Sequence, residues 1–155
     1  MDLCGGGYPR GFDSVSRRKQ EIRLFKRIQP DWLTATEVFP ELPDVEIVFD
    51  EEAGTEGRQF AYFEPATETI GLAPRIVKEP AHRQRGVFRH ELGLLVHHVY
   101  GRENLSEHIS DELSESDEVL ADQIAGFIYG EPILYDDETV QSISHGEPKR
   151  PIHLG

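Results

Sequence analysis

Five consecutive residues on one predicted helix, His90-Glu91-Leu92-Gly93-Leu94, carry the side chains best suited to chemistry. Two histidines four residues apart on a helix share one face, about one helical pitch apart, so both imidazoles can bind one Zn²⁺. A glutamate beside the first histidine can then take the proton from a zinc-bound water. Here His90 and Glu91 are present, but Leu94 stands where the second histidine would be. Leucine cannot bind a metal ion, so the function depends on how this departure is interpreted.

A second predicted helix carries two carboxylates that could serve the same site. Glu118 and Asp122 lie four residues apart, and Ala121 and Ala125 fall on the same helix face. A carboxylate from this helix could complete a metal site, and an acid one turn further on could orient a ligand histidine. Gly93 in the first helix needs a structural reason, because a glycine inside a helix costs about 1 kcal/mol relative to alanine.

The first half of the chain is predicted to hold one helix and three strands. The helix has Ser16 as its N-cap and a broad apolar face, and Pro30 stops it. Runs of β-branched and aromatic residues separated by turn residues then predict the strands. In order, the elements are a helix at 16–29 and strands at 45–49, 60–63 and 69–73, the last two joined by a turn at 64–67.

The second half is predicted to be helical. The helix with the His-Glu pair begins at Pro80 and ends at Gly101, and its wide apolar surface is typical of a central, largely buried helix. Residues 103–115 are polar and acidic and form a loop or short helix. The helix with the two carboxylates has Ser116 as its N-cap, runs to about residue 129, and is closed by Gly130.

The order of these features resembles the zincin metallopeptidases, specifically their gluzincin branch, over about residues 45–130. That family has a hairpin, a long helix with His-Glu-x-x-His and a later helix with Glu-x-x-x-Asp, and its two histidines and later glutamate bind zinc. Carried onto the matching positions, the resemblance implies that His90 is the first zinc ligand and Glu91 the general base. It further implies that Glu118 is the third ligand and that Asp122 orients the ligand histidine.

The resemblance also gives roles to two other features. The hairpin looks like the sheet edge along which such enzymes lay an extended peptide substrate, so Ile70, Gly71 and Leu72 are the expected peptide-binding edge. In zincins a glycine at the position of Gly93 lets the site helix pack closely. The structural alternative is a buried amphipathic helix with an incidental His-Glu pair.

The predicted fold class is α+β. We expect a minimal zincin-like domain in which a small sheet packs on the central site helix and on the following helix that bears Glu118. We divide the chain into an N-terminal extension with a basic helix (residues 1–44), the zincin-like domain (45–130) and a polar C-terminal tail (131–155).

Leu94 weakens the expected metal site. A catalytic zinc usually has three protein ligands, and only His90 and Glu118 remain, so we expect either no cofactor or weakly bound zinc. Without zinc, Glu91 faces water that is not activated, and peptidase activity should be very low.

Other histidines are the remaining sources of a replacement ligand. His97 returns to the face of His90, but about 10 Å further along the helix axis, and His98 is turned about 80° away. We favour the interpretation that His97 and His98 are polar residues at the exposed edge of a buried helix. Three further histidines lie in predicted loops or in the tail: His108, His145 and His153.

Composition and charge limit the classes of partner. The chain has 155 residues, a net charge of −13, one cysteine (Cys4) and no apolar run long enough for a membrane span, so we expect one domain made in the cytoplasm. Residues 1–29 carry seven Lys/Arg against three acids, a net charge of +4, and the other residues carry −17. The acidic body argues against nucleic-acid binding. The basic N-terminal helix and the termini are the expected sites for protein partners.

Three hypotheses follow. The first is a zincin-like protein without catalysis that serves as a structural or binding component; small zincin-like domains are frequent in bacteriophage genomes, so the resemblance suggests a virion or assembly component. The second is an active zinc metallopeptidase with an unusual or engineered residue at Leu94. The third is a regulator that holds a partner peptide on the edge of the hairpin.

Overall fold

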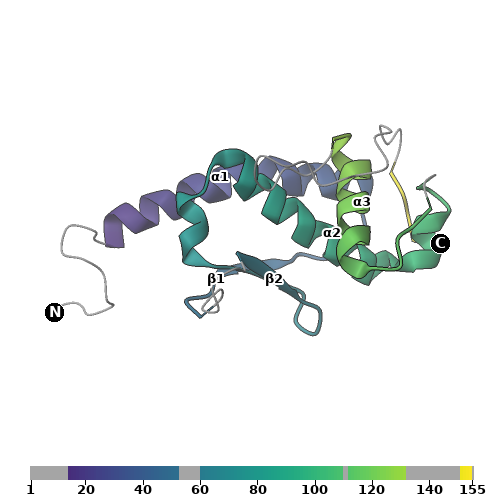
Figure 1. Cartoon of the computed structure of the whole chain (residues 1–155), viewed down its shortest axis with the longest axis horizontal. Coiled ribbons are helices and arrows are strands. Elements are labelled where there is room, and N and C mark those ends of the chain that lie inside the picture. Colours follow the sequence, from purple (N-terminus) through teal and green to yellow (C-terminus); the bar gives the residue numbers. More distant parts are fainter. Residues whose placement is uncertain (1–13, 53–59, 110–111, 132–150, 155) are drawn as a thin grey trace.

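A computed structural model of the chain describes residues 14–52, 60–109, 112–131 and 151–154. The fold is α+β, as predicted, and helix α2 (Ala81–Ser106) lies between helix α1 (Ser14–Val38) on one side and a small sheet on the other (Figure 1). Helix α3 (Asp117–Tyr129) packs across α2. In chain order the described elements are α1 (Ser14–Val38), β1 (Glu46–Phe49), β2 (Ala61–Glu64), β3 (Thr69–Leu72), the short 3₁₀ helix η1 (Pro74–Lys78), α2 (Ala81–Ser106) and α3 (Asp117–Tyr129).

The sheet has the strand order β1-β3-β2, which corrects the predicted binding edge. Strand β3 is parallel to β1 and antiparallel to β2, with Ile70 opposite Ile47 on one side and Phe63 on the other. Ile70, Gly71 and Leu72 therefore lie on the central strand, where both sides of the backbone are already paired. The prediction that they form a free peptide-binding edge is wrong, and the edges of the described sheet are β1 and β2.

Helix α1 is longer than predicted and is not an extension outside the domain. Pro30 lies inside it, although a proline in a helix interior costs about 3 kcal/mol. Packing outweighs this cost, because α1 buries Leu24 and Ile28 before the proline and Ala35 after it in the same core as α2 and α3. Helix α1 therefore shares one core with elements on the other side of the predicted boundary at residue 44.

The ends of α2 and α3 follow the sequence signals. In α2 the helical conformation breaks at Gly101, with φ of 81° and ψ of 155°, and a short helical stretch continues to Ser106. In α3 the side chain of Ser116 accepts a hydrogen bond from the amide of Val119 at 3.4 Å, and Gly130 closes the helix with φ of 71°.

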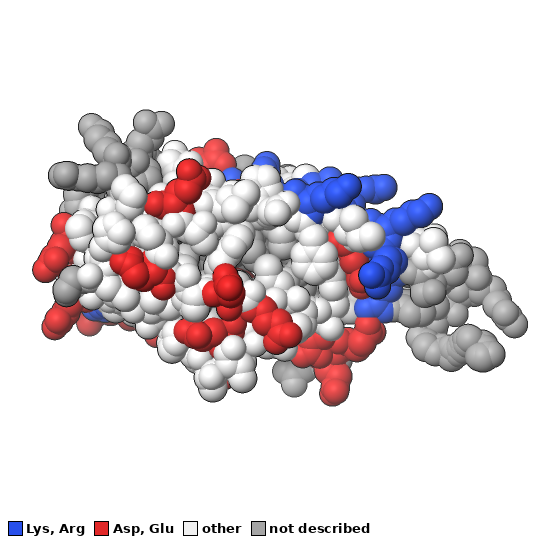
Figure 2. Space-filling model, turned by 180° about the vertical axis from the view of Figure 1, so that it is seen from behind, with Lys and Arg blue, Asp and Glu red and all other residues white. Residues whose placement is uncertain are grey.

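Part of the predicted C-terminal tail belongs to the core. Residues 132–150, most of the predicted tail, lie outside the described residues, but Ile152 is buried in the core. Figure 2 shows most of the Lys and Arg of one face gathered toward the end where α1 begins, and Asp and Glu in separate groups across that face. In the part of the chain that the structure describes, no helix has both the length and the apolar character that a membrane span requires.

Candidate functional site

Helices α2 and α3 bring three of the predicted site residues into direct contact. The imidazole of His90 lies between two carboxylates, with Nδ1 2.8 Å from Oδ1 of Asp122 and Nε2 2.9 Å from Oε1 of Glu118. The two acids come from successive turns of α3, as their spacing predicts. Asp122 is the inner partner, with a side chain 9% exposed, and Glu118 is the outer one, 73% exposed.

Gly93 allows the two helices to approach closely enough for these contacts. A Cβ atom at this position would lie 2.8 Å from the carbonyl carbon of Ala121 and closer still to its oxygen. Since that obstacle is backbone, no side-chain rotation could relieve it. The glycine therefore has a packing reason that offsets its low helix propensity.

The electrostatics of the site favour a positively charged imidazole. Burial alone would lower the pKa of His90, but the hydrogen bond with Asp122 and the negative charges of Glu91, Asp122 and Glu118 raise it to about 9. The neighbouring carboxylates therefore hold His90 protonated at neutral pH.

Glu91, the predicted general base, is buried beside this cluster. Its side-chain atom Oε1 has no hydrogen-bond partner among the described residues. Burial raises the pKa of Glu91 to about 7, although the neighbouring His90 acts to lower it. A buried carboxylate with one unpartnered oxygen and a pKa near neutrality is a pattern found at functional sites.

The histidines considered as replacement ligands have other surroundings in the structure. Leu94 is half-buried at the position four residues after it. His97 Nδ1 lies 3.9 Å from a carboxylate oxygen of Asp117, and His98 Nε2 lies 3.8 Å from one of Glu68. His108 is exposed beyond the end of α2, and His153 Nδ1 lies 2.8 Å from Oε1 of Glu41, whereas His145 lies outside the described residues.

The side chains around His90 match the donor set of a catalytic zinc only in part. His90 Nε2 and Glu118 Oε1 point at one another and are suitable in type, and Asp122 occupies the other imidazole nitrogen as an orienting acid would. Leu94, at the position of the second histidine, has no donor atom. In the described ranges no group of three His, Cys, Asp or Glu side chains is placed to share a metal ion. The side chains in the described part of the chain therefore do not make up a three-ligand catalytic zinc site.

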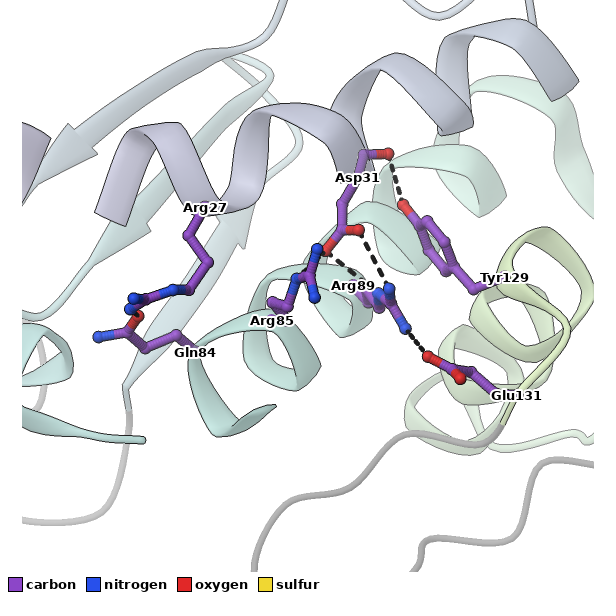
Figure 3. Close-up of polar contacts among 7 residues, drawn as sticks. All are labelled: Arg27, Asp31, Gln84, Arg85, Arg89, Tyr129 and Glu131. Carbon is purple, nitrogen blue, oxygen red and sulfur yellow. Dashed lines mark hydrogen bonds and ion pairs between the residues drawn. The ribbon is translucent and has the colours of Figure 1, made fainter. Parts of the chain in front are cut away.

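A second polar cluster beside the site was missed by the sequence reasoning (Figure 3). The guanidinium of Arg89 binds both carboxylate oxygens of the buried Asp31 at 3.1 Å, and its other nitrogen lies 2.7 Å from Glu131. It also stacks over the ring of Tyr129, whose hydroxyl donates to the backbone carbonyl of Asp31 at 2.7 Å. This cluster joins α1 to α2 and α3 next to His90. The sequence did not indicate this cluster, because no local pattern relates residues 58 positions apart.

Comparisons of the chain with protein-family models, with curated proteins and with solved structures find no match.

Proposed function

We propose that the chain is a zincin-like domain that does not catalyse peptide hydrolysis and acts as a structural or binding component of a larger assembly. The observation that carries this proposal is the environment of His90, held between Asp122 and Glu118 with leucine at the fourth residue after it. The residues that resemble a zinc site serve here to join α2 to α3.

Of the two contacts of His90, the buried one with Asp122 is the stronger. Hydrogen bonds between charged groups are roughly twice as strong as neutral ones, and the contact between His90 and Asp122 is shielded from water. The contact with Glu118 is open to solvent, and exposed ion pairs of this kind contribute about 1 kcal/mol or less. Asp122 therefore fixes the imidazole, and Glu118 adds little to the stability of the contact between α2 and α3.

A binding role is supported by two surfaces outside the contact between α2 and α3. Strands β1 and β2 are the edges of the described sheet, and an edge strand can pair with an extended segment of a partner. On α1, the basic residues Arg18, Lys19 and Lys26 are exposed beside the apolar Ile22, which is 45% exposed. A surface that combines positive charge and apolar groups suits an acidic protein partner. A place in a phage virion is part of this proposal through the zincin resemblance alone.

One observation favours the alternative, an active zinc peptidase. His90 and Glu118 converge on one point, and the unpartnered carboxylate oxygen of Glu91 lies in the same cluster. A third donor from outside the described residues would complete that set.

Peptidase activity in the presence of zinc distinguishes a non-catalytic domain from an active zinc peptidase. The full chain would be incubated with Zn²⁺ and a mixture of fluorogenic peptides, beside a matched Glu91→Gln protein that keeps the shape of the side chain. We expect the two proteins to give the same background rate. Cleavage that is at least 100-fold faster for the unmodified chain, and that a chelator abolishes, would establish the peptidase instead.

A further inference from the structure

Residues 151–154 lie against the C-terminal end of α1 and against Tyr100, which directly precedes the break in α2 at Gly101. This segment is yellow in Figure 1. The amide of Ile152 donates to the carbonyl of Val38 at 2.7 Å. The carbonyl of Ile152 accepts a hydrogen bond from the hydroxyl of Tyr100 at 2.8 Å. Both backbone polar groups of this one residue are thus paired with distant parts of the chain.

The side chain of Ile152 anchors the segment. It is 5% exposed and belongs to the main hydrophobic core, whereas Pro151, His153 and Leu154 are exposed. One buried apolar side chain, flanked by exposed residues and fixed through its own backbone, is the arrangement by which proteins recognise extended peptides.

Glu41 supplies the polar end of the same site. One of its carboxylate oxygens lies 2.8 Å from Nδ1 of His153 and accepts a hydrogen bond from the amide of Leu154 at 3.2 Å. The hydroxyl of Tyr100 accepts a hydrogen bond from the amide of Glu41 at 3.2 Å, which fixes these two residues relative to one another. The ring of Tyr100 packs edge-to-face on Phe39, with centroids 4.8 Å apart.

We propose that Val38, Glu41 and Tyr100 form a peptide-recognition site, which this chain fills with its own residues 151–154. The ligand that the site fits is an extended segment in which a β-branched apolar residue precedes a hydrogen-bond donor. The apolar side chain enters the core, its amide and carbonyl bind Val38 and Tyr100, and the following donor binds the carboxylate of Glu41. A partner peptide of this pattern enters by displacing the chain's own segment.

Competition with the chain's own segment sets the expected affinities. Covalent attachment gives a tethered ligand an effective concentration on the order of 1 mM. A site that is filled by its tethered segment must therefore bind the same free peptide with a Kd of about 1 mM or tighter once the tethered copy is removed. The unmodified chain must bind the free peptide more weakly.

The test uses the full chain and a synthetic peptide of residues 147–155. Ile152→Asp empties the site by placing a charge where the anchor lies, and far-UV circular dichroism checks that the fold is kept. Peptide is titrated into ¹⁵N-labelled protein, and the amide signal of Glu41 is followed. We expect a saturable shift in the Ile152→Asp protein and at least 10-fold weaker binding to the unmodified chain. Adding Tyr100→Phe should weaken the binding at least threefold, and a peptide with the same Ile152→Asp change should not bind.

Equal affinity for the unmodified and Ile152→Asp chains, or no saturable shift in either, would overturn the proposal. If Ile152→Asp loses its helical signal, His153→Ala takes its place, because that change removes only the exposed bond to Glu41. The peptide should then bind the His153→Ala chain more tightly than the unmodified one, and an unchanged affinity would count against the proposal in the same way.

Discussion

At the scale of single residues, the state of His90 follows from carboxylates of unequal burial. Asp122 is shielded from water and shares a short hydrogen bond with the imidazole, whereas Glu118 meets the other nitrogen at the surface. Glu91 adds a further negative charge from the core side. The sequence pattern predicted which residues would meet, because i and i+4 spacing on a helix is fixed geometry. It did not predict the protonation of the imidazole, which depends on the distance and burial of the carboxylates around it.

Asp122→Asn tests the inner contact. The amide keeps the shape of the side chain but removes its charge, so the pKa of His90 should fall from about 9 toward the ordinary value of 6.5. Glu118→Gln is the matched control and should lower it less, since that carboxylate is largely exposed. Both values can be measured by NMR titration of the imidazole signals. A larger drop for Glu118→Gln would show that the outer contact dominates.

The pH dependence of stability follows from the same groups. His90 and Glu91 both bind their proton more tightly in the folded state than in the unfolded state. The contribution of His90 is fully present below pH 6.5 and is lost as the pH rises through about 9. That of Glu91 is present below pH 4.5 and is lost as the pH rises through about 7. Urea unfolding should therefore give a free energy of unfolding lower at pH 9 than at pH 6, by roughly 1–3 kcal/mol.

A His90→Gln chain is the control for this pH dependence. Its free energy of unfolding should change much less between pH 6 and pH 9. A stability that rises with pH in the unmodified chain would contradict the assigned pKa shifts.

At the scale of elements, close packing of α2 on α3 depends on Gly93, and the ion pair of Asp31 with Arg89 adds to the apolar contacts that attach α1 to α2. The ends of α2 and α3 could be predicted because Gly101, Ser116 and Gly130 act locally. The length of α1 could not, because core contacts formed after Pro30 outweigh the local cost of the proline. The central position of β3 could not be predicted from the sequence either, since pairing between β1 and β3 depends on how distant segments meet.

Gly93→Ala should destabilise the protein. The added methyl group gains about 1 kcal/mol of helix propensity but meets the backbone of Ala121, and overpacking typically costs about 1–3 kcal/mol, more where backbone must move. We expect a net loss in the free energy of unfolding, measured in urea. The pKa of His90 should fall in the same protein, because α3 and its carboxylates must move away. A variant as stable as the unmodified chain would show that the helices are not in such close contact.

Asp31→Ala should be among the most damaging changes away from the apolar core. It leaves the guanidinium of Arg89 with a side chain 14% exposed and without its bidentate partner, and breaking a buried pair typically costs about 3–5 kcal/mol. Glu131→Ala removes the exposed partner of the same guanidinium and should cost about 1 kcal/mol or less. Thermal or urea unfolding measures both losses. Equal losses for the two changes would mean that burial does not decide the strength of this cluster.

At the scale of the whole molecule, one core includes α1, the sheet, α2, α3 and Ile152. Periodicity predicted the α+β class and the helices that carry the site. It did not show that residues near both ends of the chain belong to the core, because contacts between distant segments leave no local pattern. The charge division could be read from the sequence alone, and the structure places exposed basic side chains of α1 toward one end of the molecule (Figure 2).

The affinity for zinc tests the central claim, that Leu94 separates this site from that of a metallopeptidase. Isothermal titration with Zn²⁺ would compare the unmodified chain with Leu94→His, in which two imidazoles share one face of α2 and Glu118 supplies the third donor. We predict that zinc binds Leu94→His at one equivalent and at least 10–100-fold more tightly than the unmodified chain. If the unmodified chain binds one equivalent as tightly as Leu94→His, and His90→Ala abolishes that binding, the claim is wrong.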